Sequence, residues 1–218
     1  RPLPPLTLES ARKMLQIAII NAPQSRRLPR FRSPDIEIVA INDLADNQTL
    51  AHLFQYDSVH RKFPGTIETS GNDMIVNGHA IKMLAERDPA QLPWKDLKVD
   101  IVLESTGIFR TKELAEKHLQ AGAKKVVLSA PPKSEGIKSV VLGVNEHILD
   151  GSETIISNAS CTTNSAAPLV KVMKTLGEVQ SGYITTIHSY TSDQRLHDAP
   201  DSDLRRARAA AESIVPTT

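Results

Sequence analysis

The 218-residue sequence holds a single cysteine, and none of its apolar runs reaches 18 residues. One cysteine cannot form an internal disulfide. It therefore points to a reducing compartment and makes Cys161 the one candidate thiol nucleophile. The short apolar runs predict that no helix spans a membrane, and no segment has the pattern of a secretory signal. We therefore expect neither a membrane partner nor a disulfide framework.

Glycine and aromatic residues are also scarce: the first glycine is Gly65, and aromatic side chains make up 4% of the chain. The charge is nearly balanced, with 26 basic and 25 acidic side chains, but residues 1–35 carry seven basic and two acidic ones. A basic arm can attract nucleic acid, yet few aromatic residues accompany the arginines, so a base-stacking platform is not indicated. We interpret residues 1–35 as a solvated or aberrant basic segment and expect no nucleic-acid partner.

Apolar residues make up 40% of the chain, enough for a sizeable buried core. Short runs rich in β-branched residues predict strands, and Asn77-Gly78 between two such runs predicts a hairpin. The strands are expected at residues 17–20, 36–41, 66–68, 74–76, 80–82, 99–103, 125–128, 140–142, 154–156 and 183–187.

Helical patterns lie between these strands, at residues 49–56, 112–120 and 164–176. Thr111 is the expected N-cap of the second helix, and Gly122 is the expected residue just beyond its end. Between the first two strands, three prolines argue against a regular crossover helix. Strands that alternate with helices predict an α/β fold with a mostly parallel sheet.

The most informative segment is Ser-Asn-Ala-Ser-Cys-Thr-Thr-Asn at residues 157–164, between a predicted strand and a predicted helix. Cys161 is then expected at a helix N-terminus, where orphan N–H groups and the helix dipole favour the thiolate, the form that attacks carbonyl carbon. The hydroxyls and N–H groups of Ser160 and Thr162 suit an oxyanion or a phosphate. His188 follows 27 residues after Cys161, where its imidazole could exchange a proton with the thiol. The pattern alone also allows an inert cysteine and a structural histidine.

These residues resemble a known family, the phosphorylating glyceraldehyde-3-phosphate dehydrogenases. Residues 159–164 and His-Ser-Tyr-Thr at 188–191 are similar to the active-site pair of that family. The resemblance runs from about residue 36 to 218, with further motifs in order at 40–44, 56–60, 86–89, 104–107, 124–127, 129–131, 143–145 and 203–208. It implies a Rossmann-like doubly wound parallel sheet followed by the start of an α/β catalytic domain. The implied NAD-binding domain is residues 14–160, with its first strand near 16–20, and the implied partial catalytic domain is residues 161–218.

The resemblance also implies a reaction, with NAD as the cofactor and glyceraldehyde 3-phosphate and inorganic phosphate as substrates. Cys161 would carry the thiohemiacetal and then the acyl thioester, His188 would transfer the proton, and phosphate would release 1,3-bisphosphoglycerate. Asp43 would hold the adenosine ribose and favour NAD over NADP. The other implied contacts are Arg87 and Ser129 to the cofactor, and Ser160, Thr162, Thr191 and Arg206 to the substrate or phosphate. A cytoplasmic homotetramer without a metal is implied.

Two features depart from the family pattern. The family places a Gly-rich turn and a helix after its first strand, because the backbone must approach the pyrophosphate closely. Residues 21–32 contain no glycine, and both ends of the chain look cut. A shifted reading frame and a decayed cofactor site both explain the missing glycines, so the activity of this chain stays open. The alternatives are an erythrose-4-phosphate dehydrogenase and a non-catalytic nucleotide- or RNA-binding remnant.

Overall fold

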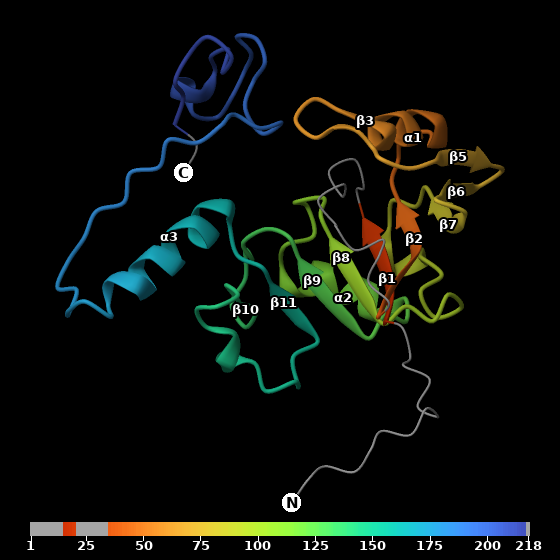
Figure 1. Cartoon of the computed structure of the whole chain (residues 1–218), viewed down its shortest axis with the longest axis horizontal. Coiled ribbons are helices and arrows are strands. Elements are labelled where there is room, and N and C mark those ends of the chain that lie inside the picture. Colours follow the sequence, from red (N-terminus) through yellow and green to blue (C-terminus); the bar gives the residue numbers. More distant parts are fainter. Residues whose placement is uncertain (1–14, 21–34, 217–218) are drawn as a thin grey trace, which may run out of the picture. The chain divides into compact units, whose positions relative to one another are not determined.

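A computed structural model describes residues 15–20 and 35–216 of the chain (Figure 1). The chain divides into two compact units, the first ending at Leu176 and the second beginning at Gly177. Most of the basic N-terminal segment, and the glycine-free segment after the first strand, lie outside the described residues. The domain boundary expected between residues 160 and 161 stays a prediction.

The first unit is built on a sheet of nine described strands, in the order β10-β11-β9-β8-β1-β2-β7-β6-β5. Its central strand, β1 (Leu15–Ile20), pairs in parallel with β2 (Ile36–Asn42) on one side and with β8 (Ile101–Glu104) on the other. The strand order therefore reverses at β1, which confirms the expected Rossmann-like, doubly wound sheet.

The remaining strands extend this sheet in both directions. Beyond β8 the pairing stays parallel through β9 (Lys125–Leu128), β11 (Ile155–Ser157) and β10 (Lys138–Ser139). Beyond β2, β7 (His79–Leu84) is parallel, while β6 (Asp73–Val76) and β5 (Ile67–Ser70) are antiparallel. A separate small hairpin joins β3 (Tyr56–Asp57) to β4 (Arg61–Lys62).

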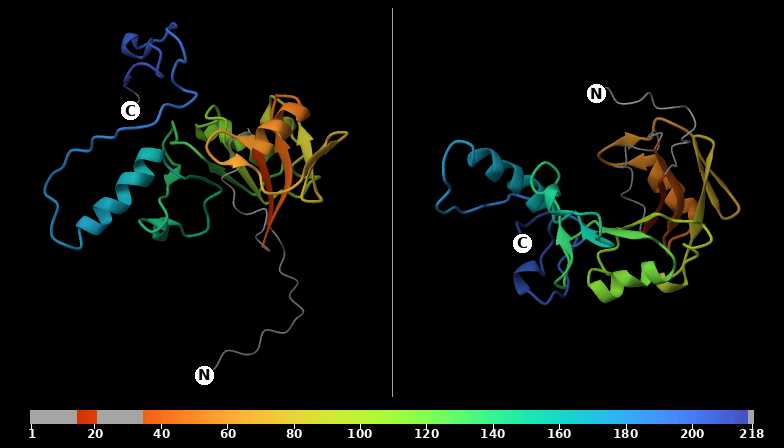
Figure 2. Two further views of the ribbon diagram at one scale, coloured as in Figure 1. Left: turned by 45° about the horizontal axis from the view of Figure 1, so that its top comes forward. Right: turned by 90° about the horizontal axis from the view of Figure 1, so that it is seen from below.

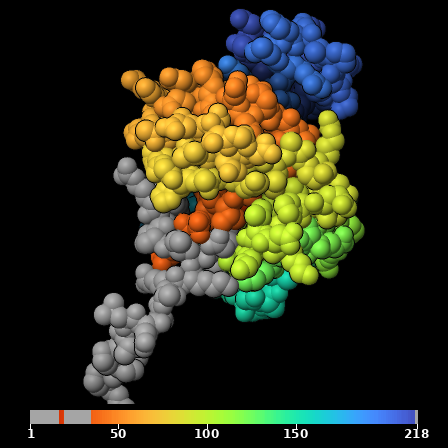
Figure 3. All heavy atoms as spheres, turned by 90° about the vertical axis from the view of Figure 1, so that its right-hand side faces the viewer, coloured from red at the N-terminus to blue at the C-terminus, as the bar shows by residue number. Residues whose placement is uncertain are grey.

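Apolar layers cover both faces of the sheet, because successive side chains of a strand point to opposite faces. Ala18 of β1 packs in a layer with Trp94 and Ala115, whereas the adjacent Ile19 packs in a second layer with Leu50 and Phe54. The first layer is covered by α2 (Lys112–Gln120), and the second by α1 (Asn47–Gln55) (Figure 2). Figure 3 shows atoms of α1 (orange) and of the β5–β6 hairpin (yellow) forming one continuous surface at this end of the unit.

The helix and turn signals of the sequence are confirmed at α2 and at the hairpin. The hydroxyl of Thr111 accepts the N–H of Leu114, and Gly122 follows the helix with φ +108°. A Cβ at Gly122 would lie 2.7 Å from the backbone of Lys95, so the position requires glycine. Asn77 and Gly78 both have positive φ, as expected for a two-residue hairpin turn between β6 and β7.

One predicted strand in the first unit was wrong. The strand expected at 140–142 is replaced by β10, because the side-chain oxygen of Asn145 takes the N–H of Val141 (2.8 Å) and turns the chain away from the sheet. The helix expected at 164–176 is confirmed as α3 (Cys161–Met173), and both of its ends lie three residues earlier, with Ser160 as the N-cap. Short 3-10 turns lie at η2 (Pro89–Gln91) and η3 (Glu146–Ile148).

The second unit contains one short 3-10 turn, η4 (Leu204–Arg206), within its described residues 177–216. The strand predicted at 183–187 was wrong: no strand is present there, and Tyr183 and Ile187 are fully exposed. A strand is stable only where another strand satisfies its backbone groups, and none in the described part of the chain pairs with this segment. Instead, ion pairs between arginine and aspartate link segments within the unit: Arg195–Asp201, Arg205–Asp203, Arg206–Asp193 and Arg208–Asp198.

No helix in the described ranges is long and apolar enough to cross a membrane.

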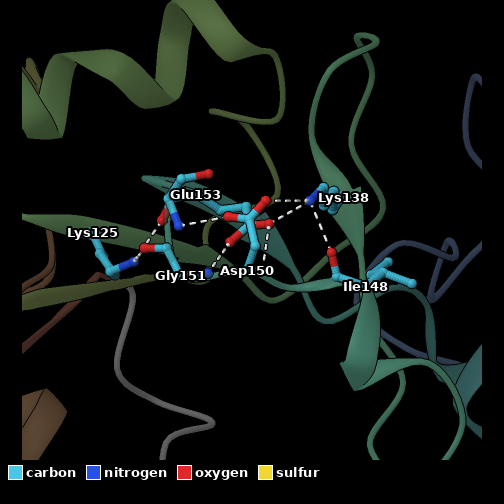
Figure 4. A network of polar contacts seen from close by, with 7 residues as sticks. Lys125, Lys138, Ile148, Asp150, Gly151 and Glu153 are labelled. Atoms are coloured by element: carbon cyan, nitrogen blue, oxygen red, sulfur yellow. Dashed lines mark hydrogen bonds and ion pairs between the residues drawn. The ribbon is translucent and has the colours of Figure 1, made fainter.

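At the edge of the sheet, a polar network links the loop before β11 to the strands beside it (Figure 4). Lys138 pairs with Glu153 and donates to the carbonyl of Ile148 (2.9 Å), while the carboxylate of Glu153 accepts the N–H groups of Asp150 and Gly151. The hydrogen bond from Lys138 and these N–H donors lower the pKa of Glu153 from its ordinary 4.5 to about 2.

The lowered pKa predicts an acid-sensitive contribution to stability. A carboxyl whose pKa falls on folding stabilises the native state above its unfolded pKa, and this stabilisation is lost as pH falls through the window from about 4.5 to about 2. The melting temperature of Glu153→Gln should therefore lie below that of the parent chain at pH 7 and converge with it near pH 2. Thermal unfolding followed by circular dichroism measures this, with the exposed Glu135→Gln as the matched control. A constant difference between pH 7 and pH 2 would contradict the prediction.

Candidate functional site

A pocket of about 350 Å³ lies at the carboxyl ends of β2, β7 and β8. Parallel strands deliver the residues that follow them to one edge of the sheet, and ligands of doubly wound sheets bind at this edge, where the strand order reverses. The pocket is lined by the last residue of β2 and by residues that follow β2, β7 and β8: Asn42, Asp43, Leu44, Glu86, Arg87, Pro89, Thr106, Ile108 and Phe109.

Asp43 is the pocket residue that follows β2. Its N–H donates to the carbonyl of Leu84 (3.0 Å), which fixes the backbone, and its Oδ1 accepts the N–H of Ala45 (3.0 Å). Its Oδ2 is buried and has no hydrogen-bond partner among the described residues. An unsatisfied buried carboxylate oxygen costs free energy, so this atom is suited to accept a hydroxyl from a ligand in the pocket.

Arg87 lines the pocket from the loop after β7, beside Asp43, and this loop is fixed by the side chain of Asn42. The buried amide of Asn42 donates to the carbonyl of Glu86 (2.9 Å) and accepts the N–H of Glu86 (2.8 Å). These two hydrogen bonds continue the β2–β7 pairing beyond the strands and hold the exposed Arg87 at the pocket. An amide side chain directly after the apolar run 36–41 was the signal in the sequence that could have identified Asn42.

Ser129 is at the same edge of the sheet but does not line this pocket. It follows β9 directly, and its N–H donates to the carbonyl of Glu104 (2.9 Å) at the end of the neighbouring strand β8. The structure thus brings Asp43 and Arg87 together and leaves Ser129 exposed on the next loop. Its contact with a cofactor stays a prediction.

Cys161 begins α3 after a tight turn from β11. Ala159 in that turn has φ +58° although it has a Cβ, and its N–H donates to the hydroxyl of buried Ser157 (3.0 Å). That hydroxyl in turn donates to the carbonyl of Ala130 (2.8 Å) on the next loop. A non-glycine residue in this conformation stores strain that the surrounding bonds must hold, which is typical of residues beside functional sites.

The helix N-terminus that carries Cys161 is capped by Ser160. The hydroxyl of Ser160 accepts the N–H of Thr163 (2.9 Å), and the side chain of Asn164 donates to the carbonyls of Asn158 (2.7 Å) and Ser160 (2.9 Å). Cys161 is exposed and Thr162 is half-buried in the first turn. The placement of Cys161 at a helix start is confirmed, and the helix dipole there stabilises a thiolate relative to a thiol.

The other predicted residues belong to the second unit. The Nδ1–H of half-buried His188 donates to the carbonyl of Ser189 (2.6 Å), which places the lone pair of the neutral imidazole on Nε2. The hydroxyl of Thr191 bonds to the side chain of Gln194 (3.0 Å). Because Cys161 and His188 lie in different units, their pairing stays a prediction.

Arg206 in the second unit is held by a carboxylate. Its NH2 group donates to Asp193 (2.5 Å), a hydrogen bond that raises the pKa of the guanidinium, while its buried Nε has no partner among the described residues. The guanidinium therefore keeps a donor for a further acceptor, and bidentate binding of phosphate oxygens is chemistry for which arginine is suited.

The sheet order and the carboxylate after its second strand define a doubly wound α/β protein of the dinucleotide-binding class. Residues 24–112 match the family model for the glyceraldehyde 3-phosphate dehydrogenase NAD-binding domain, and residues 160–218 match the model for its C-terminal domain. The chain belongs to the glyceraldehyde-3-phosphate dehydrogenase family.

Among curated relatives, the enzyme named glyceraldehyde-3-phosphate dehydrogenase of Thermotoga maritima is 62% identical over 187 residues, 86% of this chain and 56% of that protein. The Geobacillus stearothermophilus protein of the same name is 55% identical over 189 residues, with the same coverage of both chains. The Clostridium acetobutylicum protein is 53% identical over 187 residues, 85% of this chain and 56% of its own. The chain thus spans about half the length of the curated relatives that it matches.

The strained turn before Cys161 generates a prediction. Ala159→Val places a β-branched side chain at φ +58° in a buried position, which should lower the free energy of unfolding by roughly 1–3 kcal/mol. Ala159→Gly is the matched control, because glycine adopts this conformation freely, and it should change the stability by less than about 1 kcal/mol. Urea unfolding measures both variants. Equal destabilisation by valine and glycine would show that the backbone conformation is not the cause.

Proposed function

We propose that this chain is part of an NAD-dependent dehydrogenase that oxidises glyceraldehyde 3-phosphate to 1,3-bisphosphoglycerate through a thioester on Cys161. The observation that carries the proposal is the placement of Asp43 and Cys161, which both follow parallel strands at the carboxyl edge of one sheet. A carboxylate for a ribose and a nucleophile at a helix start are the two components that such an enzyme needs.

The residues of the pocket fit the adenosine half of NAD. Asp43 offers a buried acceptor without a partner, which suits a ribose hydroxyl and repels the 2′-phosphate that distinguishes NADP. Arg87 lines the same pocket from the loop after β7, and we include Ser129, which follows β9, as a further cofactor contact. When bound, NAD supplies the hydride acceptor that converts a thiohemiacetal on Cys161 into a thioester.

The protein side of the reaction is nucleophilic catalysis. The thiolate of Cys161 attacks the aldehyde carbon, a C–S bond forms as the C=O π bond breaks, and the imidazolium of His188 protonates the oxygen. The neutral imidazole of His188 then takes this hydroxyl proton back as the thioester forms. Ser160 and Thr162 at the helix start, with Thr191 and Arg206 in the second unit, bind the substrate phosphate or the attacking inorganic phosphate. Inorganic phosphate then attacks the acyl carbon, the C–S bond breaks, and the thiolate is regenerated.

We further propose that the full-length protein acts in the cytoplasm as a homotetramer, as expected from its family. The sole cysteine of the chain agrees with a reducing compartment, in which the thiolate stays available for catalysis.

Replacement of the pocket carboxylate tests the cofactor proposal. Asp43→Asn keeps the size of the side chain but removes the charge, so the affinity for NAD should fall about tenfold, and the preference for NAD over NADP should narrow. Isothermal titration of the chain with each dinucleotide measures both effects.

Asp46→Asn is the matched control for this experiment. Asp46 lies three residues further on, caps α1 with its carboxylate, and does not line the pocket. This variant should bind NAD as the parent chain does. Equal losses of affinity in the two variants would remove the support for Asp43 as the ribose ligand.

The reactivity of Cys161 tests the catalytic proposal. A thiolate stabilised by a helix start and an imidazole should react with iodoacetamide near pH 7, and His188→Ala should slow the reaction about tenfold. His197→Ala, an exposed histidine of the same unit, is the control and should leave the rate unchanged. An unreactive Cys161 in the folded chain, or an equal reaction rate in the parent and in His188→Ala, would be evidence against a Cys161–His188 pair.

A further inference from the structure

A chain of buried hydrogen bonds leads from the core of the first unit to the wall of the pocket. The indole Nε1 of Trp94 lies 3.2 Å from Nδ1 of His118, and Nε2 of His118 lies 3.1 Å from Oε2 of Glu104. Trp94 and His118 are fully buried, and Glu104 is 2% exposed. The proposed reaction uses none of these three side chains.

The chemistry of these partners fixes the proton positions. An indole N–H can only donate, so Nδ1 of His118 must accept from Trp94. The neutral imidazole then carries its proton on Nε2 and donates it to the carboxylate of Glu104. His118 is therefore held in one tautomer between a donor and an acceptor, and its ring cannot flip without the loss of both bonds.

The carboxylate of Glu104 also binds the loop that follows β8. Its Oε1 accepts both the N–H (2.7 Å) and the hydroxyl (2.5 Å) of Thr106, whose hydroxyl oxygen accepts the N–H of Ile108 (3.0 Å). Thr106, Ile108 and Phe109 line the pocket. The ring of Phe109 also lies edge-on to that of His118, with centroids 6.2 Å apart.

Apolar burial supports this loop only through the half-buried Phe109, because Ile108 is 67% exposed and Gly107 has no side chain. The carboxylate of Glu104 accepts one hydrogen bond from His118 and two from Thr106, and so joins the core histidine to the loop. A glutamine cannot replace it, since its amide nitrogen would face either the N–H of His118 or the N–H of Thr106, donor against donor.

We propose that Trp94, His118 and Glu104 are positioning residues that hold residues 105–109 in the geometry that binds the adenosine half of the dinucleotide. This inference rests on the proposed cofactor site and adds to it the residues that shape one of its walls. It assigns His118 a fixed tautomer and Glu104 the role of joining the core to the loop.

The first test needs no ligand. In Glu104→Gln, the amide protons of Thr106 and Ile108 should exchange with solvent at least about tenfold faster than in the parent chain, as measured by NMR. The amide of Met83, which donates to the carbonyl of Asn72 (2.8 Å) in the β6–β7 hairpin, reports on global opening and should not change. The ¹⁵N shifts of His118 in the parent chain should show the proton on Nε2.

Thr106→Val and Thr106→Ser form the matched pair, and they also serve if Glu104→Gln does not fold. Valine keeps the shape of threonine without its hydroxyl, so exchange at Ile108 should rise and the dissociation constant for NAD should increase about tenfold. Serine keeps the hydroxyl and should restore both values to within about threefold of the parent.

Three results would overturn the proposal: unchanged exchange at Ile108 in Thr106→Val, exchange that rises equally at Met83, or an Nδ1–H tautomer of His118. Failure of the parent chain to bind NAD is a different outcome. It would contradict the proposed cofactor site, whereas the exchange rates and the tautomer would still show whether the buried chain orders the loop.

Discussion

The parallel pairing of β1 with both β2 and β8 is the constraint on which the rest of the first unit depends. It makes the strand order reverse at the centre of the sheet, so the loops after β2 and β8 separate and leave a pocket at the carboxyl edge. Because β9 and β11 continue in parallel beyond β8, the same edge also receives the turn that leads into α3. Asp43 and Cys161 thus share one edge for a topological reason.

Buried polar groups give this edge its shape. The amide of Asn42 fixes the Glu86–Arg87 loop on one wall, and the carboxylate of Glu104 fixes Thr106 on the other. Each group would be costly to bury alone, and the hydrogen bonds to backbone and side chains offset that cost. Between these walls, the buried Oδ2 of Asp43 has no hydrogen-bond donor among the described residues, which points to a ligand hydroxyl.

The sequence predicted the features that depend on local signals. Thr111 and Gly122 mark the ends of α2 because capping is local, and Asn77-Gly78 marks its hairpin because the turn needs positive φ. The expected strand at 183–187 was wrong because pairing depends on a partner elsewhere in the chain. The link from Trp94 to Glu104 was also hidden, since His118 stands in a polar helix sequence and nothing local shows that it is buried. Asp43 was identified through the family resemblance and its place after a strand.

Titration of the ¹⁵N-labelled chain with NAD shows most directly whether the adenosine half of the dinucleotide binds at the carboxyl edge beside β2 and β8. If it binds there, the largest changes in backbone amide shifts fall on Asp43, Arg87 and residues 106–109, and these changes saturate together. Changes that fall instead on the β5–β6 hairpin or on the loop before β11, with this edge unaffected, would contradict it.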